Sequence, residues 1–395
     1  MMPRGPSASK FPESEPAHPG RLASLRRLPL AAYVFAGAFV LRLICLTRLT
    51  ASASLLPNGG DIAFYHEWAQ RILAGEWSDG RAFYGLPLYA YWLAAVYALT
   101  GVNAFVPGLL QCAFDAGTAL LLYKITAHIL REHETAGART TGAIAAAVWV
   151  FYVPAETFAI VRMPATIAVF VWWFVVWQVV KRTEPPPLRT LFVLGLLIGI
   201  VAMGVATILF VVPLLVAALI WRWRAKMTRA AVVLLVGVVL GAAPCWLHNI
   251  FIAHDPVFLS AHSGINFWIG NNPDATGYPH FGEVRAGQAE MLQDSIAIAE
   301  RAAGRPLKRS EVAAYWSGRA RAFIAAHPGQ WLSLLGRKLW NFWNAFPYDD
   351  LSVVAMLRDE HVTLPGFGFG LIAAFAIAGT PIALRVFRTS RWIVA

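Results

Sequence analysis

Eight apolar stretches divide this chain of 395 residues, and they limit its possible folds more than any other feature. They cover residues 28–46, 106–130, 142–153, 165–180, 188–205, 208–221, 230–252 and 367–386. A helix of about 20 apolar residues crosses the hydrocarbon core of a bilayer, and these stretches reach or approach that length. With 58% hydrophobic and 14% charged residues, the chain is not a soluble domain. We predict an all-α integral membrane protein with about eight transmembrane helices.

The net charge of +11 is explained by short basic clusters between the apolar stretches. They lie at residues 21–27, 131–139, 181–189, 222–229 and 385–391. Because no basic face studded with aromatic residues is present, nucleic acid is not an expected partner. The clusters fall in every second loop, so the positive-inside rule places them and the N-terminus in the cytoplasm.

The sequence therefore divides into four parts. Residues 1–27 are rich in Pro, Ser and Glu and are expected to be a disordered cytoplasmic N-terminus. The membrane core follows at 28–253 and includes a long outer loop, 47–105. A second outer segment occupies 254–365, and a last membrane helix with a cytoplasmic tail occupies 366–395.

Both outer segments contain helical patterns. In the first, the amphipathic pieces 61–75 and 87–100 are expected to lie at the membrane surface. In the second, Ser310 with Glu311 is predicted to open one helix, which His327-Pro328-Gly329 closes. Residues 331–346 then mix Lys338 with Trp and Phe, a pattern typical of a helix near lipid headgroups.

Asp61 is the main candidate for chemistry. If residues 61–73 are helical, it lies in the first turn, where backbone amides and the helix dipole keep a carboxylate ionised and able to accept a proton. Tyr65 and Trp68 share its face. An equally adequate interpretation is that Asp61 only caps the helix after Gly59-Gly60.

Arg162 and Glu156 lie on the outer link 154–164. A guanidinium at the membrane edge suits a lipid-linked phosphate, and snorkelling or an ion pair with Glu156 is the alternative. Arg42 and Lys338 are weaker candidates of the same kind.

No cofactor or metal is expected. The spacings of His248, His254, His262 and His280 with Asp255 fit no standard ligand pattern. The three cysteines have no CxxC spacing and are predicted to be small buried hydrophobic residues. There is no P-loop, dinucleotide fingerprint or GxSxG motif, so an enzyme of this kind needs an activated substrate delivered from the lipid.

The order of these motifs resembles one family. Asp61 with Tyr65 and Trp68-Ala69, then Gly75-Glu76-Trp77 and the aromatic run 83–92, is similar to the first outer loop of family 39 glycosyltransferases of the GT-C fold. These are relatives of the dolichyl-phosphate-mannose protein mannosyltransferases and of the bacterial aminoarabinose transferases acting on lipid A. The run 264–273, Gly-Ile-Asn-Phe-Trp-Ile-Gly-Asn-Asn-Pro, looks like a bacterial branch of the same family.

The resemblance implies a GT-C bundle in the bacterial inner membrane, with the active site outside the cytoplasm. It would transfer a sugar from a polyprenyl-phosphate donor to a lipid, glycan or protein acceptor, with inversion. Asp61 would be the general base, and Arg162 with Lys338 would hold the phosphate. The substrate-binding candidates are Tyr65, Tyr84, Glu156, Arg162, Asn266, Asn271, Asn272 and Lys338.

Three departures from the family pattern stand out. Many members have a second acid after the first, whereas Ile62 follows Asp61 here, and His248-Asn249 stands where Arg-Asn is expected. Members usually continue through further spans after the equivalent of Val386, so a short or truncated form is expected. A lipid-carrier flippase or transporter, and a noncatalytic assembly subunit with the same fold, are alternative functions.

Overall fold

The computed structural model describes residues 29–50, 52, 55–57, 59–132, 136–223, 228–344, 357 and 359–386. The predicted disordered segment 1–27 and the basic residues Arg388 and Arg391 lie outside the described residues. Within the described part, every regular element is a helix. The prediction of an all-α protein is confirmed at that level.

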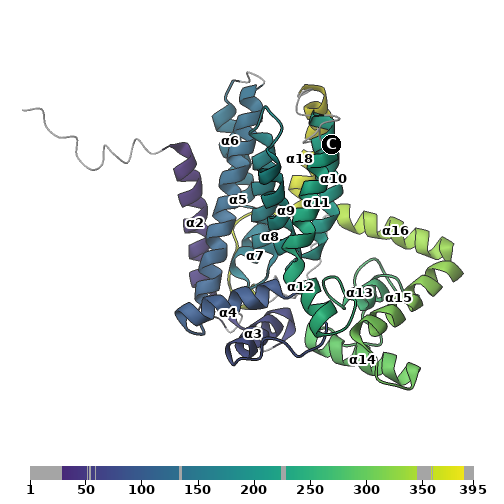
Figure 1. Ribbon diagram of the computed structural model, residues 1–395. Helices are drawn as coiled ribbons and strands as arrows, with labels where there is room; N and C mark the ends of the chain where they lie inside the picture. The colour runs from purple at the N-terminus through teal and green to yellow at the C-terminus, as the bar shows by residue number, and fades with distance from the viewer. Residues whose placement is uncertain are drawn as a thin grey trace, which may run out of the picture.

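Each predicted apolar stretch contains a helix, and these helices stand side by side as a bundle (Figure 1). They are α2 (Leu30–Leu49), α5 (Phe105–Glu132), α6 (Ala138–Val150), α8 (Ala165–Val180), α9 (Leu188–Ala202), η2 (Ala206–Phe210) with α10 (Val211–Trp223), α11 (Thr228–Gly241) and α18 (Phe369–Val386). Three short helices extend two of them at the breaks: α7 (Val153–Ile160) precedes α8, and α12 (Ala243–Leu247) and η4 (His248–Ile252) follow α11.

Fewer helices than eight are long enough to be membrane spans by themselves. In the described residues, four are long and apolar enough, and up to six if each bent pair is one span. The pairs are α7 with α8, bent by 118°, and α11 with the segment Ala243–Ile252, bent by 54°. Pro164 and Pro244 lie at these breaks, where proline removes a helical hydrogen bond. The described helices are compatible with a helical membrane protein, and four to six of them are candidate spans by length and composition.

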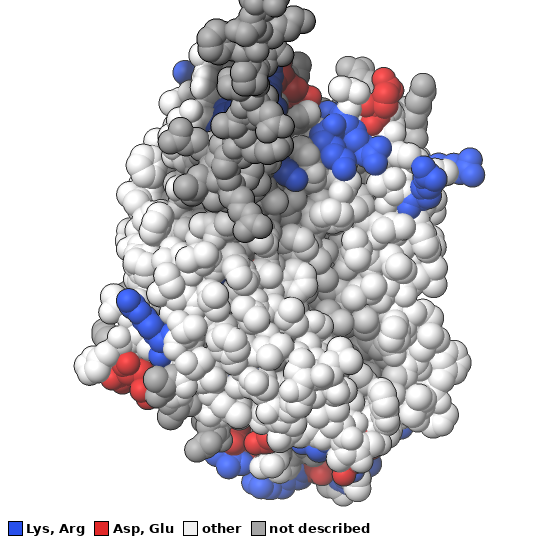
Figure 2. Space-filling model, turned by 90° about the vertical axis from the view of Figure 1, so that its left-hand side faces the viewer, with Lys and Arg blue, Asp and Glu red and all other residues white. Residues whose placement is uncertain are grey.

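Charged side chains gather at the two ends of the bundle, with a broad belt of uncharged side chains between them (Figure 2). Arg131 ends α5, Arg139 begins α6, Lys181 follows α8 and Arg222 ends α10. Because successive helices alternate in direction, all of these residues fall at one end. The two long segments lie at the other end (Figure 1).

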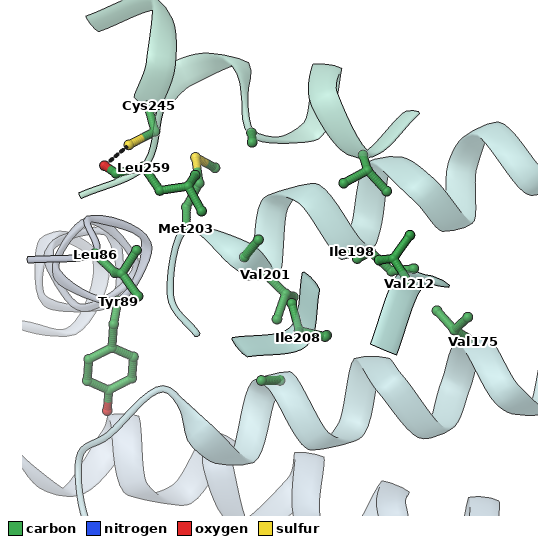
Figure 3. Close-up of a cluster of buried hydrophobic side chains, with 14 of the residues drawn as sticks. Leu86, Tyr89, Val175, Ile198, Val201, Met203, Ile208, Val212, Cys245 and Leu259 are labelled. Atoms are coloured by element: carbon green, nitrogen blue, oxygen red, sulfur yellow. Dashed lines mark hydrogen bonds between the residues drawn. The ribbon is translucent and has the colours of Figure 1, made fainter. Parts of the chain in front are cut away.

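The largest apolar core joins α8, α9, α10 and α11 to the helices α3 (Gly60–Leu73) and α4 (Leu88–Thr100), and Figure 3 shows part of it. The Cys245 thiol donates to the carbonyl oxygen of Leu259 there, at 2.9 Å. Cys45, Cys112 and Cys245 are all free and buried, which confirms the sequence prediction for them.

Helices α9 and α11 touch backbone to backbone through glycines. A Cβ atom on Gly199 would lie 2.1 Å from the carbonyl oxygen of Val238, and one on Gly241 would lie 2.2 Å from that of Leu196. Gly195 and Gly237 make equally close approaches one turn away. The two facing Gly-x-x-x-Gly motifs therefore set the distance between these helices.

An ion-pair cluster is buried in the bundle. Arg42 of α2 is fully buried and donates to Asp115 of α5 at 2.7 Å and to Glu156 of α7 at 3.1 Å. Its guanidinium also donates to the carbonyl oxygens of Trp149 and Val150 at the end of α6. The cluster joins four helices. Arg42 is therefore not available as a phosphate ligand.

An extended contact closes the junction between α6 and α7. The backbone amide of Phe367 donates to the carbonyl oxygen of Phe151 at 3.0 Å. The backbone amide of Val153 donates to the carbonyl oxygen of Phe367 at 3.1 Å. Gly366 is required beside it, because a Cβ there would lie 2.0 Å from the Phe151 oxygen.

The two long segments form a second group of helices at one end of the bundle (Figure 1). These helices are α3 (Gly60–Leu73), α4 (Leu88–Thr100), α13 (Ser263–Gly270), α14 (Gln288–Ala303), α15 (Arg309–Ala326) and α16 (Pro328–Trp343). Helix α15 begins one residue before the predicted start and ends before His327, as predicted. Helix α16 runs back toward the bundle and exposes Leu332, Leu339, Trp340 and Phe342.

Candidate functional site

Asp61 is the second residue of α3 and does not occupy its N-cap position. Gly59 occupies that position, and Gly60 begins the helix with φ +71°. The interpretation of Asp61 as the capping residue is therefore wrong. Ile62, which stands where relatives have a second acid, is buried against Ile160 and Val161. A carboxylate at position 62 would therefore lie among apolar side chains and not beside the Asp61 carboxylate.

Asp61 lines a cavity of about 420 Å³ between α3 and the second long segment. Two other predicted site residues line the same cavity: Asn266 of α13 and Lys338 of α16. Gln288, at the start of α14, His262 and Tyr278 add to its polar lining. The structure thus brings together side chains from four separate parts of the chain.

Gln288 links Asp61 to the residues around it. Its side-chain amide donates to an Asp61 carboxylate oxygen at 3.5 Å. Burial raises the pKa of Tyr65, the Asp61 carboxylate raises it further, and a hydrogen bond with Gln288 opposes the shift. Tyr65 is buried and therefore remains a neutral phenol beside the carboxylate. Nothing in the polar stretch around Gln288 singled this residue out in the sequence.

Lys338 is the cation of the cavity. Its ammonium group lies 3.3 Å from the side-chain oxygen of Asn271, to which it donates. Partial burial lowers the pKa of Lys338. The tip of this residue faces the cavity from α16, while the apolar residues of the same helix face outward. The ammonium group of Lys338 therefore makes its side of the cavity suitable for binding an anionic group.

Asn271 and Asn272 make hydrogen bonds within the protein and do not line the Asp61 cavity, and their role as substrate ligands stays a prediction. Both are buried, and their side-chain amides donate to backbone carbonyl oxygens at the end of α13, those of Phe267 and Trp268. The Asn272 oxygen accepts from the backbone amide of Asp274. Asn271 acts on the cavity only by holding Lys338. These residues satisfy carbonyl groups that a helix leaves unpaired at its end.

Arg162 lies in the sharp break between α7 and α8. Its side chain is buried, yet none of its three nitrogens has a hydrogen-bond partner among the described residues. It does not line the Asp61 cavity. Its charge acts on His66 of α3, where burial lowers the histidine pKa and the guanidinium lowers it further. A buried cation in this state is costly unless a ligand pairs with it.

Gln111 of α5 holds the break in place. Its amide donates to the carbonyl oxygens of Phe158 and Val161, next to Arg162, and its oxygen accepts from the Tyr89 hydroxyl. The Tyr89 ring contacts that of Tyr65, with centroids 5.4 Å apart. Figure 3 shows the Tyr89 side chain pointing away from the other labelled side chains of the core. A buried polar network thus connects the Arg162 break with the helix that carries Asp61.

Glu156 does not pair with Arg162, contrary to the alternative considered for these residues. It is fully buried with Arg42, and its second oxygen has no hydrogen-bond partner among the described residues. Glu156 is therefore part of the bundle's ionic cluster, and the prediction that it binds substrate is not supported by its position. Tyr84 lines a different cavity on the other side of Gly85.

The histidines considered as metal ligands contact other kinds of residue. His248 stacks on Phe83 with centroids 4.2 Å apart and bonds to the Ser78 hydroxyl at 2.6 Å. His262 bonds to the carbonyl oxygen of Tyr84. Across the described ranges, no three His, Cys, Asp or Glu residues are grouped so that they could hold a metal ion.

Comparison with protein-family models, with curated proteins and with solved structures finds no match to this chain.

Proposed function

We propose that the protein is a membrane glycosyltransferase that moves a sugar from a polyprenyl-phosphate carrier to an acceptor outside the cytoplasm. The observation that carries this proposal is the cavity that joins Asp61, Asn266 and Lys338. It combines a carboxylate that can accept a proton, an amide that can bind hydroxyl groups and a cation that can bind phosphate. The helices that contribute its lining residues, among them α3, α13 and α14, lie at the end of the bundle opposite the basic loops (Figure 1), and the positive-inside rule supports assigning that end to the outer side.

The chemistry assigned to Asp61 is general base catalysis. An acceptor hydroxyl oxygen attacks the anomeric carbon of the donor sugar, and its proton moves to the Asp61 carboxylate. The bond between that carbon and the phosphate oxygen breaks, and the electron pair leaves with the polyprenyl phosphate. Attack from the side opposite the phosphate inverts the anomeric centre.

Two cations support the phosphate assignment. Lys338 faces the Asp61 cavity directly. Arg162 is a buried guanidinium with no hydrogen-bond partner among the described residues, and phosphate matches the fork of its donors. We assign the leaving phosphate to Lys338, and Arg162, which does not line this cavity, is the candidate for a second anionic group at the α7–α8 break.

The test is sugar transfer by purified protein from a polyprenyl-phosphate sugar, with Asp61→Asn compared with Glu67→Gln. Glu67 is an exposed acid of the same helix, so it controls for loss of a charge on α3. We expect D61N to lower transfer by about 10²–10⁴-fold because general base catalysis is worth that much. Thermal unfolding verifies that both variants are folded. Equal turnover of D61N and E67Q would show that Asp61 is not the base.

Transport of a lipid-linked sugar is the second candidate, and one observation favours it. The Arg42, Asp115 and Glu156 cluster places ionisable side chains inside the bundle, as transporters often do. Vesicles containing D61N distinguish the two functions. A transporter would still carry the lipid-linked sugar across the vesicle membrane, whereas the glycosyltransferase would lose product formation.

A further inference from the structure

A second cavity, of about 450 Å³, lies between α3 and the turn that follows it. Its walls carry four aromatic rings, those of Phe64, Trp68, Phe83 and Tyr84. Leu292 of α14 and Arg309 of α15 close it from the other side. The volume lies within the range of sites that hold small molecules.

The polar groups of this second cavity are balanced in charge. Arg71 and Arg309 are its cations, and Glu76 and Asp79 are its anions, with the Ser78 hydroxyl beside them. Arg309 donates to Asp79 at 2.6 Å and to the carbonyl oxygen of Ala82. The remaining side-chain nitrogen of Arg309, Nε, is buried and has no hydrogen-bond partner among the described residues. The lining of the second cavity therefore offers both hydrogen-bond donors and hydrogen-bond acceptors, and its charges sum to zero.

Only a thin wall separates the second cavity from the Asp61 cavity. At Gly85, an added Cβ would lie 3.0 Å from the Phe64 ring and 3.2 Å from the Gln288 side-chain oxygen. Phe64 and Gly85 line the second cavity, whereas Gln288 lines the first and donates to Asp61. A ligand in the second cavity is thus next to the residue that positions Asp61.

We propose that the second cavity binds a neutral saccharide, and that this saccharide belongs to the acceptor. Rings match the apolar C–H faces of a sugar, and paired acids and guanidinium groups match its hydroxyls. The balanced charge does not favour a phosphorylated headgroup, and four charged side chains do not suit an acyl chain. The acceptor assignment rests on the proposed function, and it makes the acceptor a glycan rather than a bare lipid or an unmodified protein.

In that arrangement the bound saccharide lies against the wall at Gly85, and a hydroxyl of the next sugar unit, which continues into the Asp61 cavity, lies at Asp61. Its oxygen forms the new bond to the anomeric carbon of the donor as the bond to phosphate breaks, and its proton passes to Asp61. Polyprenyl phosphate leaves with the electron pair, so the step needs no further reactant.

Saccharide binding can be measured without any transfer. The probes are neutral disaccharides ending in glucose, galactose, mannose or N-acetylglucosamine, observed by saturation-transfer NMR with the purified protein in detergent. The test variant is Arg71→Gln with Glu76→Gln, because both side chains are exposed and the change keeps the net charge. Arg301→Gln with Glu67→Gln is the matched control at exposed positions outside the cavity.

We expect at least one disaccharide to bind, and the test variant to raise its Kd about tenfold, the loss of one to two hydrogen bonds. The control should bind as the wild type does. Binding of none of the disaccharides, or equal affinity of test variant and control, would overturn the proposal. So would binding of a sugar phosphate or lipid headgroup in their place.

The D61N variant separates this proposal from the proposed function. Saccharide binding by D61N without sugar transfer agrees with both. Normal transfer by D61N alongside normal saccharide binding would remove the role of Asp61 and leave a saccharide site. Loss of transfer in D61N by a protein that binds no saccharide would leave the glycosyltransferase and remove this site.

Discussion

The glycine contact between α9 and α11 gives the sharpest prediction for stability. In Gly199→Ala, the new Cβ would lie 2.1 Å from the Val238 oxygen, whereas ordinary contact begins at 3.4 Å. Relieving the clash therefore requires the two helices to separate by about 1.3 Å, from 2.1 to 3.4 Å. A gap of about 0.5–1 Å already costs a quarter to half of the dispersion energy of the atoms concerned.

We expect Gly199→Ala to lower the free energy of unfolding by about 1–3 kcal/mol, the usual cost of overpacking. Gly37→Ala on α2 and Gly379→Ala on α18 are matched controls, because a Cβ at either position meets nothing within 4 Å. There the higher helix propensity of alanine acts alone and favours the variant by up to about 1 kcal/mol. The variant and its controls should thus shift stability in opposite directions.

The measurement is thermal and denaturant unfolding of the purified proteins in one detergent, followed by tryptophan fluorescence. The double variant Gly199→Ala with Gly241→Ala adds a check, because the two glycines face each other and the first alanine already moves the helices apart. Its loss should be smaller than the sum of the single losses. A Gly199→Ala protein as stable as Gly37→Ala would refute the close backbone contact.

Two further predictions concern the charged residues. Arg42→Met should lower the free energy of unfolding by about 3–5 kcal/mol, because it leaves two buried carboxylates without their cation. Glu156→Gln should keep both stability and sugar transfer, measured in the same assays, whereas loss of transfer in a stable Glu156→Gln protein would restore Glu156 as a substrate ligand. Since burial lowers the pKa of Lys338, its charge is lost at a lower pH than that of a free lysine, and the KM for the donor should rise early on the alkaline side. Lys338→Arg stays charged and should remove that rise; an identical pH profile in the variant would place the titrating group elsewhere.

The helices were predictable from the sequence because apolar length is a local property. Each apolar stretch formed a helix. Helix α16 begins at Pro328, and α4 ends immediately before Gly101. The number of spans was less predictable, because Pro164 and Pro244 bend two of the apolar segments instead of ending them. Proline identifies a break in the hydrogen bonding of a helix but does not give the angle on its two sides.

The hydrogen-bond partners of individual side chains could not be predicted, because they depend on how distant segments pack together and a single sequence does not give that packing. Arg42 and Arg162 carry the same group, yet the first is satisfied by Asp115 and Glu156, while the second has no hydrogen-bond partner among the described residues. Asn272 belongs to a polar run that indicated ligand binding, and its amide satisfies helix carbonyls. Gln288 reaches Asp61 across 227 residues of sequence, a distance that no local pattern bridges.

The extended contact at Phe367 has a consequence for how the molecule is made. The oxygen of Phe151 and the amide of Val153 find their partners only when Phe367 arrives. At about 5–20 residues per second, that residue is synthesised on the order of 10–40 s later. Until then the turn between α6 and α7, next to the buried Arg42 cluster, has open backbone groups that only water can satisfy. The first half of the bundle is thus completed by a segment that leaves the ribosome long after α6 and α7, so residues 366–367 fix this junction at a late stage of assembly.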